Sequence, residues 1–467
     1  MFAIGSLLVL RPCFSANLFG KLLGMHILQR KPLFSVLSGL VIFASCLLVP
    51  HRSEGQSLQK PPIDIATAKS HFAEAATLFE EDGGALWGTS LAGPIIFVDR
   101  DTHIAIANQA DSQNTLLPVD GVFSGRLLSN VMIANTAIDW NETKWTMLVW
   151  PLPENADERR VLLAHEAWHR IQEALGFPMS GAANAHLNSL NGRYLLQLEW
   201  RALGVALQSK GDQRMEAISD ALHFRFRRQQ LVPGCETEEQ GMELNEGLAE
   251  YTGVRLALAP AERISRTVVQ LKNRPGDFKT FVRSFAYLSG PAYGLLLDEL
   301  DPDWLKNVSA KSDLAKLLQE GAQIEVETDL ETAVTERAPK FNGQALWTAE
   351  KKRDDERLAQ ISSLTNKYTA GPRLIIPLEK MNMFFDPTEL IPLGNSGTFY
   401  PTLTITDRWG VLTATGGALI SSDFREVSVS VPAEYANALK TTDWELELNK
   451  GWSIRAAAEH VFRIGID

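Results

Sequence analysis

The sequence predicts an α+β fold in which an N-terminal sheet and a helical middle part precede a C-terminal β-rich domain. Short apolar runs and alternating apolar residues fill 93–152, as expected for strands. Apolar residues then recur at helical spacing through 155–320, and strand-like alternation returns over 371–467. Because the chain has 467 residues, two or three domains are expected.

The composition excludes several classes of protein. Apolar residues make up 45% and charged residues 22% of the chain, which is ordinary for a globular protein and unlike a disordered or multi-span membrane protein. The formal net charge is −11, from 45 basic and 56 acidic residues. Since binding to phosphates needs a basic surface, nucleic acid is not expected as a partner.

Residues 1–55 are predicted to be a signal peptide or a membrane anchor. The stretch 33–49 carries no charge, Arg30 and Lys31 precede it, and small residues follow near Gly55. This order is typical of a secretory signal, although 17 uncharged residues are also at the short limit for crossing a bilayer. We therefore expect an exported protein, periplasmic or extracellular, that touches a membrane only through 33–49 if that segment is uncleaved or lipidated.

The expected elements begin with a helix over 65–81, which Gly83 and Gly84 end. Four strands are then expected, at 94–98, near 104–106, at 137–140 and at 145–150. The last two flank the polar residues 141–144 and are predicted to form a hairpin.

The helical part is expected to complete a single region over 62–340. Its predicted helices cover 155–175, 190–210, 212–230, 236–258, 276–300 and 311–320. A charged connecting helix is expected over 341–370, and the β-rich domain over 371–467. Within that domain a hairpin is predicted from 398–406 and 411–418, with further strands at 427–431 and 444–448.

The pattern that indicates chemistry is His165-Glu166-Ala-Trp-His169. On a helix, histidines four residues apart lie on one face and can bind one Zn²⁺ ion together. Glu166 is rotated away from that face, so its carboxylate can take a proton from a water activated by the metal instead of binding the metal.

A zinc site of this kind needs a third protein ligand. Glu246 and Glu250 are again four residues apart, so one can bind the metal while the other accepts a hydrogen bond from a zinc-binding histidine. Glu246 follows His169 by 77 residues, and Glu199 is a rival third ligand at shorter range.

The two motifs, His165-Glu-Ala-Trp-His169 and Leu244-Asn-Glu246-Gly-Leu-Ala, resemble those of the gluzincin zinc metallopeptidases over about 155–300. The resemblance implies a thermolysin-like catalytic domain with Glu246 as third ligand and Glu250 as partner of a ligating histidine. It also implies an oxyanion-binding phenol, for which Tyr287, in Tyr287-Leu-Ser-Gly290, is the first choice and Tyr293 the second.

This chain departs from the aminopeptidase N-like members of the family in two ways. Its 77-residue separation between the motifs is much longer than theirs, and no exopeptidase signature precedes His165. The resemblance therefore implies peptide hydrolysis without deciding between endopeptidase and exopeptidase activity.

The sequence thus predicts an exported zinc metallopeptidase with one Zn²⁺ ion and a peptide or protein substrate. Two alternatives stay open: a secreted zinc-containing binding or scaffold protein, and a zinc amidohydrolase acting on a non-peptide substrate. A purely structural zinc site has no need of Glu166, which favours an enzyme. Cys235, the single cysteine after residue 55, is expected to be a small, partly buried residue and not a nucleophile.

Overall fold

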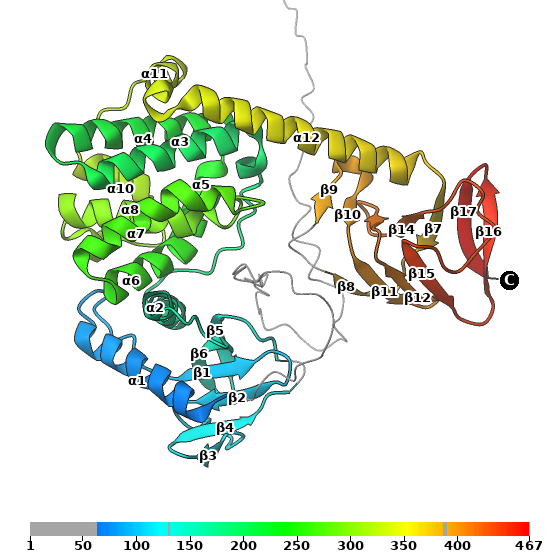
Figure 1. The fold of residues 1–467 in the computed structure, drawn as a ribbon, viewed down its shortest axis with the longest axis horizontal. Coiled ribbons are helices and arrows are strands. Elements are labelled where there is room, and N and C mark those ends of the chain that lie inside the picture. Colours follow the sequence, from blue (N-terminus) through cyan, green and yellow to red (C-terminus); the bar gives the residue numbers. More distant parts are fainter. Residues whose placement is uncertain (1–62, 129–130, 386–389, 467) are drawn as a thin grey trace, which may run out of the picture. The chain divides into compact units, whose positions relative to one another are not determined.

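The computed structural model describes residues 63–128, 131–385 and 390–466 (Figure 1). The expected signal peptide or anchor, including 33–49, lies outside these ranges. Within them, no helix is both long and apolar enough to cross a membrane. The chain divides into two compact units, one up to Gly343 and one from Gln344 onward.

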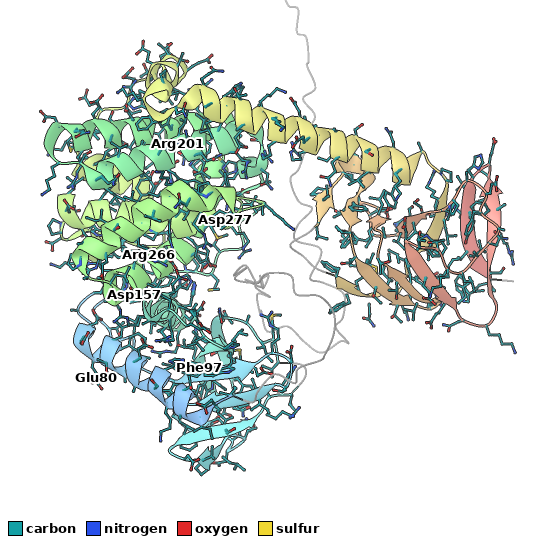
Figure 2. The ribbon with its side chains drawn as sticks, in the orientation of Figure 1. Glu80, Phe97, Asp157, Arg201, Arg266 and Asp277 are labelled. Atoms are coloured by element: carbon teal, nitrogen blue, oxygen red, sulfur yellow. The ribbon has the colours of Figure 1, made fainter. Side chains whose placement is uncertain are left out.

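The first unit begins with helix α1 (Ile65–Asp82) and a six-stranded sheet. The side chain of Asp64 caps α1 by accepting from the Thr67 N–H at 2.7 Å, and Gly83 ends it with a φ of 55°. The ring of Phe72 in α1 stacks on that of Phe97 in the sheet, with centroids 4.3 Å apart (Phe97 is labelled in Figure 2).

The sheet has the order β3-β4-β2-β1-β6-β5, and only β1 and β6 pair in parallel. Its strands are β1 (Ile95–Asp99), β2 (Ile104–Ala107), β3 (Leu117–Val119), β4 (Val122–Arg126), β5 (Thr136–Trp140) and β6 (Thr143–Trp150). The β5–β6 hairpin lies where the sequence predicts it. Strands β3 and β4 are additional, and they extend the sheet beyond β2.

The helical part follows the sheet directly. It contains α2 (Ala156–Gln172), α3 (Leu190–Gln208), α4 (Gly211–Leu231), α5 (Cys235–Met242), α6 (Leu248–Ala257), α7 (Pro260–Asn273), α8 (Phe285–Leu300), α9 (Trp304–Asn307), α10 (Leu314–Gly321) and α11 (Leu330–Arg337). Helix α2 packs against β5 and β6 on one side and against α6 on the other, so it lies between the sheet and the remaining helices (Figure 1).

Two expected helices differ from those observed. The one expected over 236–258 is α5 and α6 joined by a π-helical turn, η3 (Glu243–Gly247). The one expected over 276–300 begins only at Phe285. Helix α7 was not among the predicted helices, although its Ile264, Val268 and Leu271 recur at helical spacing and lie partly or fully buried.

The second unit joins helix α12 (Gly343–Thr369) to two sheets. A seven-stranded sheet has the order β16-β17-β7-β14-β13-β10-β9, and a four-stranded sheet the order β15-β12-β11-β8. The strands are β7 (Arg373–Pro377), β8 (Asn382–Phe385), β9 (Ile391–Pro392), β10 (Thr398–Tyr400), β11 (Leu403–Asp407), β12 (Gly410–Ala414), β13 (Ala418–Ile420), β14 (Glu426–Ser430), β15 (Trp444–Leu448), β16 (Trp452–Ala458) and β17 (Val461–Ile466).

One apolar core joins the two sheets, and it contains Ile376 and Val429 from the larger sheet and Leu412 and Leu446 from the smaller. The expected hairpin is present as β11 and β12, but its predicted flanks are divided between the sheets. Pro401 separates β10 from β11, and proline cannot donate to a strand ladder. The predicted mixed α+β class, with a helical middle part and C-terminal sheets, is confirmed.

Candidate metal site

The two motif histidines lie side by side on α2. The helix begins at Asn155, whose side chain accepts from the Glu158 N–H at 3.0 Å, and it places His165 and His169 one turn apart on its buried side. Their Nε2 atoms are 3.2 Å from each other. Two imidazole nitrogens therefore point at the same place.

Glu246 joins the histidines from the π-helical turn η3. Its Oε2 atom lies 3.6 Å from Nε2 of His165 and 3.5 Å from Nε2 of His169. Tetrahedral coordination with bonds of about 2.0–2.1 Å separates neighbouring ligand atoms by roughly 3.3–3.4 Å. The three observed separations bracket that value, so these residues fit a zinc ion. Short π-helical segments are frequent at functional sites.

Gly253 allows the helix that follows η3 to reach α2. A Cβ atom at Gly253 would come within 2.6 Å of the Val161 carbonyl oxygen, so the backbones of α6 and α2 approach each other closely at this point. This close approach brings the Glu246 end of the helix beside the histidines. The packing of α6 on α2 therefore brings the two motifs together in space, although they lie far apart in the sequence.

The outer nitrogen of each histidine has its own partner. Nδ1 of His165 lies 3.0 Å from Oε2 of Glu250, whose Oε1 accepts from Arg266 at 3.2 Å (Arg266 is labelled in Figure 2). Nδ1 of His169 lies 2.8 Å from Oε1 of Gln172. When each Nδ1–H donates to its partner, both Nε2 lone pairs are free to bind a metal.

Gln172 also connects His169 to the third candidate ligand. Its amide nitrogen donates to Oδ1 of Asn245 at 2.8 Å, and Asn245 donates to Oε1 of Glu246 at 3.0 Å. Sequence reasoning did not identify Gln172, Asn245 or Arg266. Asn245 stands inside the Leu244-Asn-Glu246 motif, and Gln172 lies three residues after His169, so spacing alone gives a weak signal for both.

Glu166 is buried next to these groups without a hydrogen-bond partner for its Oε2 atom. Burial raises the pKa of its carboxyl above the ordinary value, although His165 and His169 oppose that shift. A carboxylate with a raised pKa, free of structural hydrogen bonds, is suited to accept a proton and release it again.

Tyr287 reaches the same centre from α8. Its hydroxyl donates to Oε2 of Glu246 at 2.5 Å, and its ring stacks on that of His165 with centroids 5.3 Å apart. A Cβ at Gly290 would lie 2.3 Å from the Gly247 Cα, so the two glycines let α8 approach η3 closely. Burial and Glu246 hold the pKa of Tyr287 well above its usual range, so the phenol keeps its proton.

The site carries an excess of acidic groups. Glu166, Glu246 and Glu250 surround two histidines, and all five side chains are buried. Burial alone would lower the pKa of His165, yet its contacts with Glu246 and Glu250 raise it to about 10. Such a cluster attracts positive charge, whether a proton or a divalent cation.

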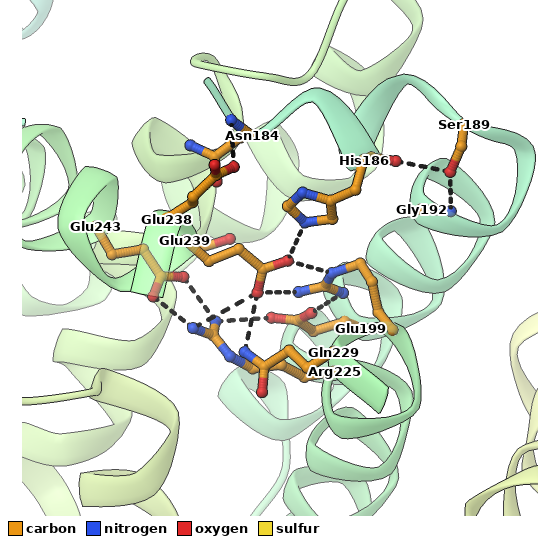
Figure 3. A network of polar contacts seen from close by, with 12 residues as sticks. Asn184, His186, Ser189, Gly192, Glu199, Arg225, Gln229, Glu238, Glu239 and Glu243 are labelled. Carbon is orange, nitrogen blue, oxygen red and sulfur yellow. Dashed lines mark hydrogen bonds and ion pairs between the residues drawn. The ribbon is translucent and has the colours of Figure 1, made fainter. Parts of the chain in front are cut away.

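The rival residue Glu199 belongs to a different cluster (Figure 3), and the other rival, Tyr293, contacts Glu199. Oε1 of Glu199 accepts from the Tyr293 hydroxyl at 2.8 Å, and its Oε2 accepts from Arg228 at 2.6 Å. Within the described residues, neither Glu199 nor Tyr293 forms a hydrogen bond or ion pair with His165 or His169. The structure therefore brings together His165, Glu166, His169, Glu246, Glu250 and Tyr287, and leaves the two rivals out.

A second group, His186, Cys235 and Glu239, also has metal-binding atoms close together. Arg228 donates to both oxygens of Glu239 at 2.7 and 3.0 Å, and it supplies a positive charge where a cation would have to bind. Burial, and to a smaller extent the negative charge of Glu239, raise the pKa of Cys235 to about 12, so its thiol stays protonated. Since a metal-binding cysteine must be a thiolate, this group is a poor metal site.

This reading of the second group gives a prediction about Cys235. The Cys235→Ser protein is expected to keep the same zinc content as the wild type, measured by atomic spectroscopy. The native thiol should react with iodoacetamide at pH 8 at least about tenfold more slowly than the unfolded one, because its pKa lies far above that pH. Loss of zinc on substitution, or rapid native alkylation, would contradict the assignment.

The chain matches no protein-family model, no curated protein and no solved structure. The site is defined by its own residues: it is a buried centre of two histidines and one glutamate.

Proposed function

We propose that this protein is an exported zinc-dependent metallopeptidase of the gluzincin type, with a thermolysin-like catalytic region. The observation that supports it most is the convergence of His165, His169 and Glu246, whose three ligand atoms lie 3.2, 3.5 and 3.6 Å apart. This separation suits one tetrahedral zinc ion with an open fourth position.

Each residue of the site has a defined part in the proposed reaction. Zinc held by the two histidines and Glu246 would supply Lewis-acid chemistry, which polarises the scissile carbonyl and makes water a better nucleophile at neutral pH. Glu166 takes the proton of the attacking water and gives it to the leaving nitrogen. Tyr287, whose phenol stays protonated, would turn its single O–H from Glu246 to the oxygen that becomes negative.

The surroundings of Glu166 favour hydrolysis over a purely structural zinc site. A buried carboxylate oxygen without a hydrogen bond costs stability, and a scaffold protein would gain nothing from it. Glu250, Gln172 and Asn245 already satisfy the structural needs of the ligands. A role in taking up and releasing protons explains why the carboxylate oxygen of Glu166 is kept free of structural hydrogen bonds.

The experiment that tests the proposed function combines metal analysis with a peptide-library digest of the full chain. One zinc per chain is expected, together with cleavage that a chelator abolishes and added zinc restores. A protein that holds zinc but cleaves no peptide would contradict peptidase activity. It would point instead to the zinc-containing scaffold or to hydrolysis of a non-peptide amide.

The proposed export is tested separately, by N-terminal sequencing of the protein recovered from each cell fraction. A start near residue 56 in the exported fraction is expected if the uncharged stretch 33–49 is part of a cleaved signal. A cytoplasmic protein that starts before residue 33 would contradict export.

A further inference from the structure

Arg283 lies in the turn just before α8, four residues ahead of Tyr287. Its side chain is half-buried, and its Nε atom is buried with no hydrogen-bond partner. Within the described residues, its guanidinium makes no hydrogen bond and no ion pair. It is therefore a cation near the candidate metal site that the protein itself leaves unpaired.

Three other arginines of the helical part have anionic partners. Arg225 donates to both oxygens of Glu243, Arg228 donates to Glu199 and Glu239, and Arg266 donates to Glu250. An arginine that is partly buried loses hydration of its charge and needs acceptors in exchange; Arg170, for example, donates to the carbonyls of Leu91 and Ala92. Arg283 has no such acceptor in the described chain, and an anion is the acceptor that matches its charge.

The location of Arg283 indicates which anion this is. Arg283 stands four residues before Tyr287, and the charges of Glu246 and Tyr287 raise its pKa against the lowering by burial, so the guanidinium lies within the electrostatic field of the candidate site. The site otherwise presents the acids Glu166, Glu246 and Glu250, which repel a negatively charged substrate. A single unpaired guanidinium at its edge offsets that repulsion at one point.

We propose that Arg283 binds a carboxylate of the substrate, so that the enzyme prefers peptides with a negative charge near the bond that is cleaved. The planar guanidinium matches a carboxylate through two parallel hydrogen bonds. Two sources share this chemistry, the free C-terminal carboxylate of a peptide and the side chain of an Asp or Glu residue. The inference rests on the proposed peptidase function and names its substrate class.

The test compares three matched peptides on the zinc-loaded full chain: one with a free C-terminus, one with a C-terminal amide, and one amide with a single Glu added. The wild type is expected to favour at least one carboxylate-bearing peptide by about 10- to 100-fold in kcat/KM. Arg283→Gln should remove this preference and leave the neutral amide within about threefold. Whichever charged peptide loses the advantage identifies the source of the carboxylate.

Two further variants keep the result interpretable. Arg283→Lys, which keeps the charge but not the fork, should retain part of the preference. Arg274→Gln, which removes an exposed arginine of the neighbouring segment, should change nothing. An equal loss on charged and neutral peptides in Arg283→Gln, or a wild type indifferent to carboxylates, would overturn the proposal.

A binding measurement separates this inference from the proposed function. Calorimetry on the zinc-loaded Glu166→Gln protein compares the free and amidated peptides without turnover, and is repeated after adding Arg283→Gln. Tighter binding of the carboxylate that depends on Arg283 supports the inference even if the wild type cleaves nothing. Cleavage of peptides without any such dependence would leave the peptidase standing and refute the role of Arg283.

Discussion

The Glu166→Gln protein is expected to lose peptide hydrolysis by roughly 10²- to 10⁴-fold in kcat/KM while still binding one zinc ion per chain. Glutamine keeps the shape of the side chain but cannot take up a proton. Because Glu166 does not belong to the group His165, His169 and Glu246, its replacement leaves the ligand atoms in place. Stopped assays on the best library peptide, with zinc measured on the same sample, provide the test.

The matched control for that substitution is Glu173→Gln, just after α2. Glu173 is exposed and, in the part of the chain that the structure describes, pairs with Lys144 alone, at 2.8 Å, so its loss should leave hydrolysis unchanged. Glu166→Gln should also be as stable as the wild type or more so, since it removes a buried charge that lacks a hydrogen bond. Full activity in Glu166→Gln would refute the proposed mechanism, and loss of zinc would refute the separation of roles.

The local part of the site could be predicted from the sequence. Spacing of four residues places His165 and His169 on one face of any helix, and the cap at Asn155 and the apolar residues around the motif fix that helix. The same reasoning predicts that Glu246 and Glu250 share a side. These two arrangements depend only on local spacing within a helix, so they could be predicted without a structure.

The convergence of the two helices was not accessible in this way. It depends on Gly253 lying against Val161 and on Gly247 lying against Gly290, contacts between segments far apart in the sequence. A π-helical turn also replaces the continuous helix expected over 236–258. Its extra residue per turn alters the direction in which Glu246 points, and helical periodicity cannot predict it.

The buried arginine cluster was missed for a related reason. Arginine is seldom fully buried, and the spacing of charges along α4 indicates no buried cluster, yet Arg225 and Arg228 are almost fully buried. Each finds its carboxylate on another helix, Glu243 and Glu239 for example. Pairing across helices is a property of tertiary packing, and the sequence gives no spacing rule for it.

Arg225 has a particular position in that cluster (Figure 3). It donates to both oxygens of Glu243, each at 2.7 Å, and Glu243 is the first residue of the π-helical turn that carries Glu246. Both side chains of the pair are fully buried. The pair therefore fixes the start of the turn three residues before the candidate zinc ligand.

Replacing Arg225 with Met is expected to lower the free energy of unfolding by about 3–5 kcal/mol, because Glu243 is left buried without its partner. The folded fraction should also bind zinc more weakly, since η3 is no longer held. Denaturant unfolding and zinc titration measure the two effects. Arg227→Met is the control on the same helix: its partner Glu331 is mostly exposed, so a change of at most about 1 kcal/mol is expected. Equal stability of the two variants would contradict the role of the buried pair, and unaltered zinc affinity in Arg225→Met would separate that pair from the metal site.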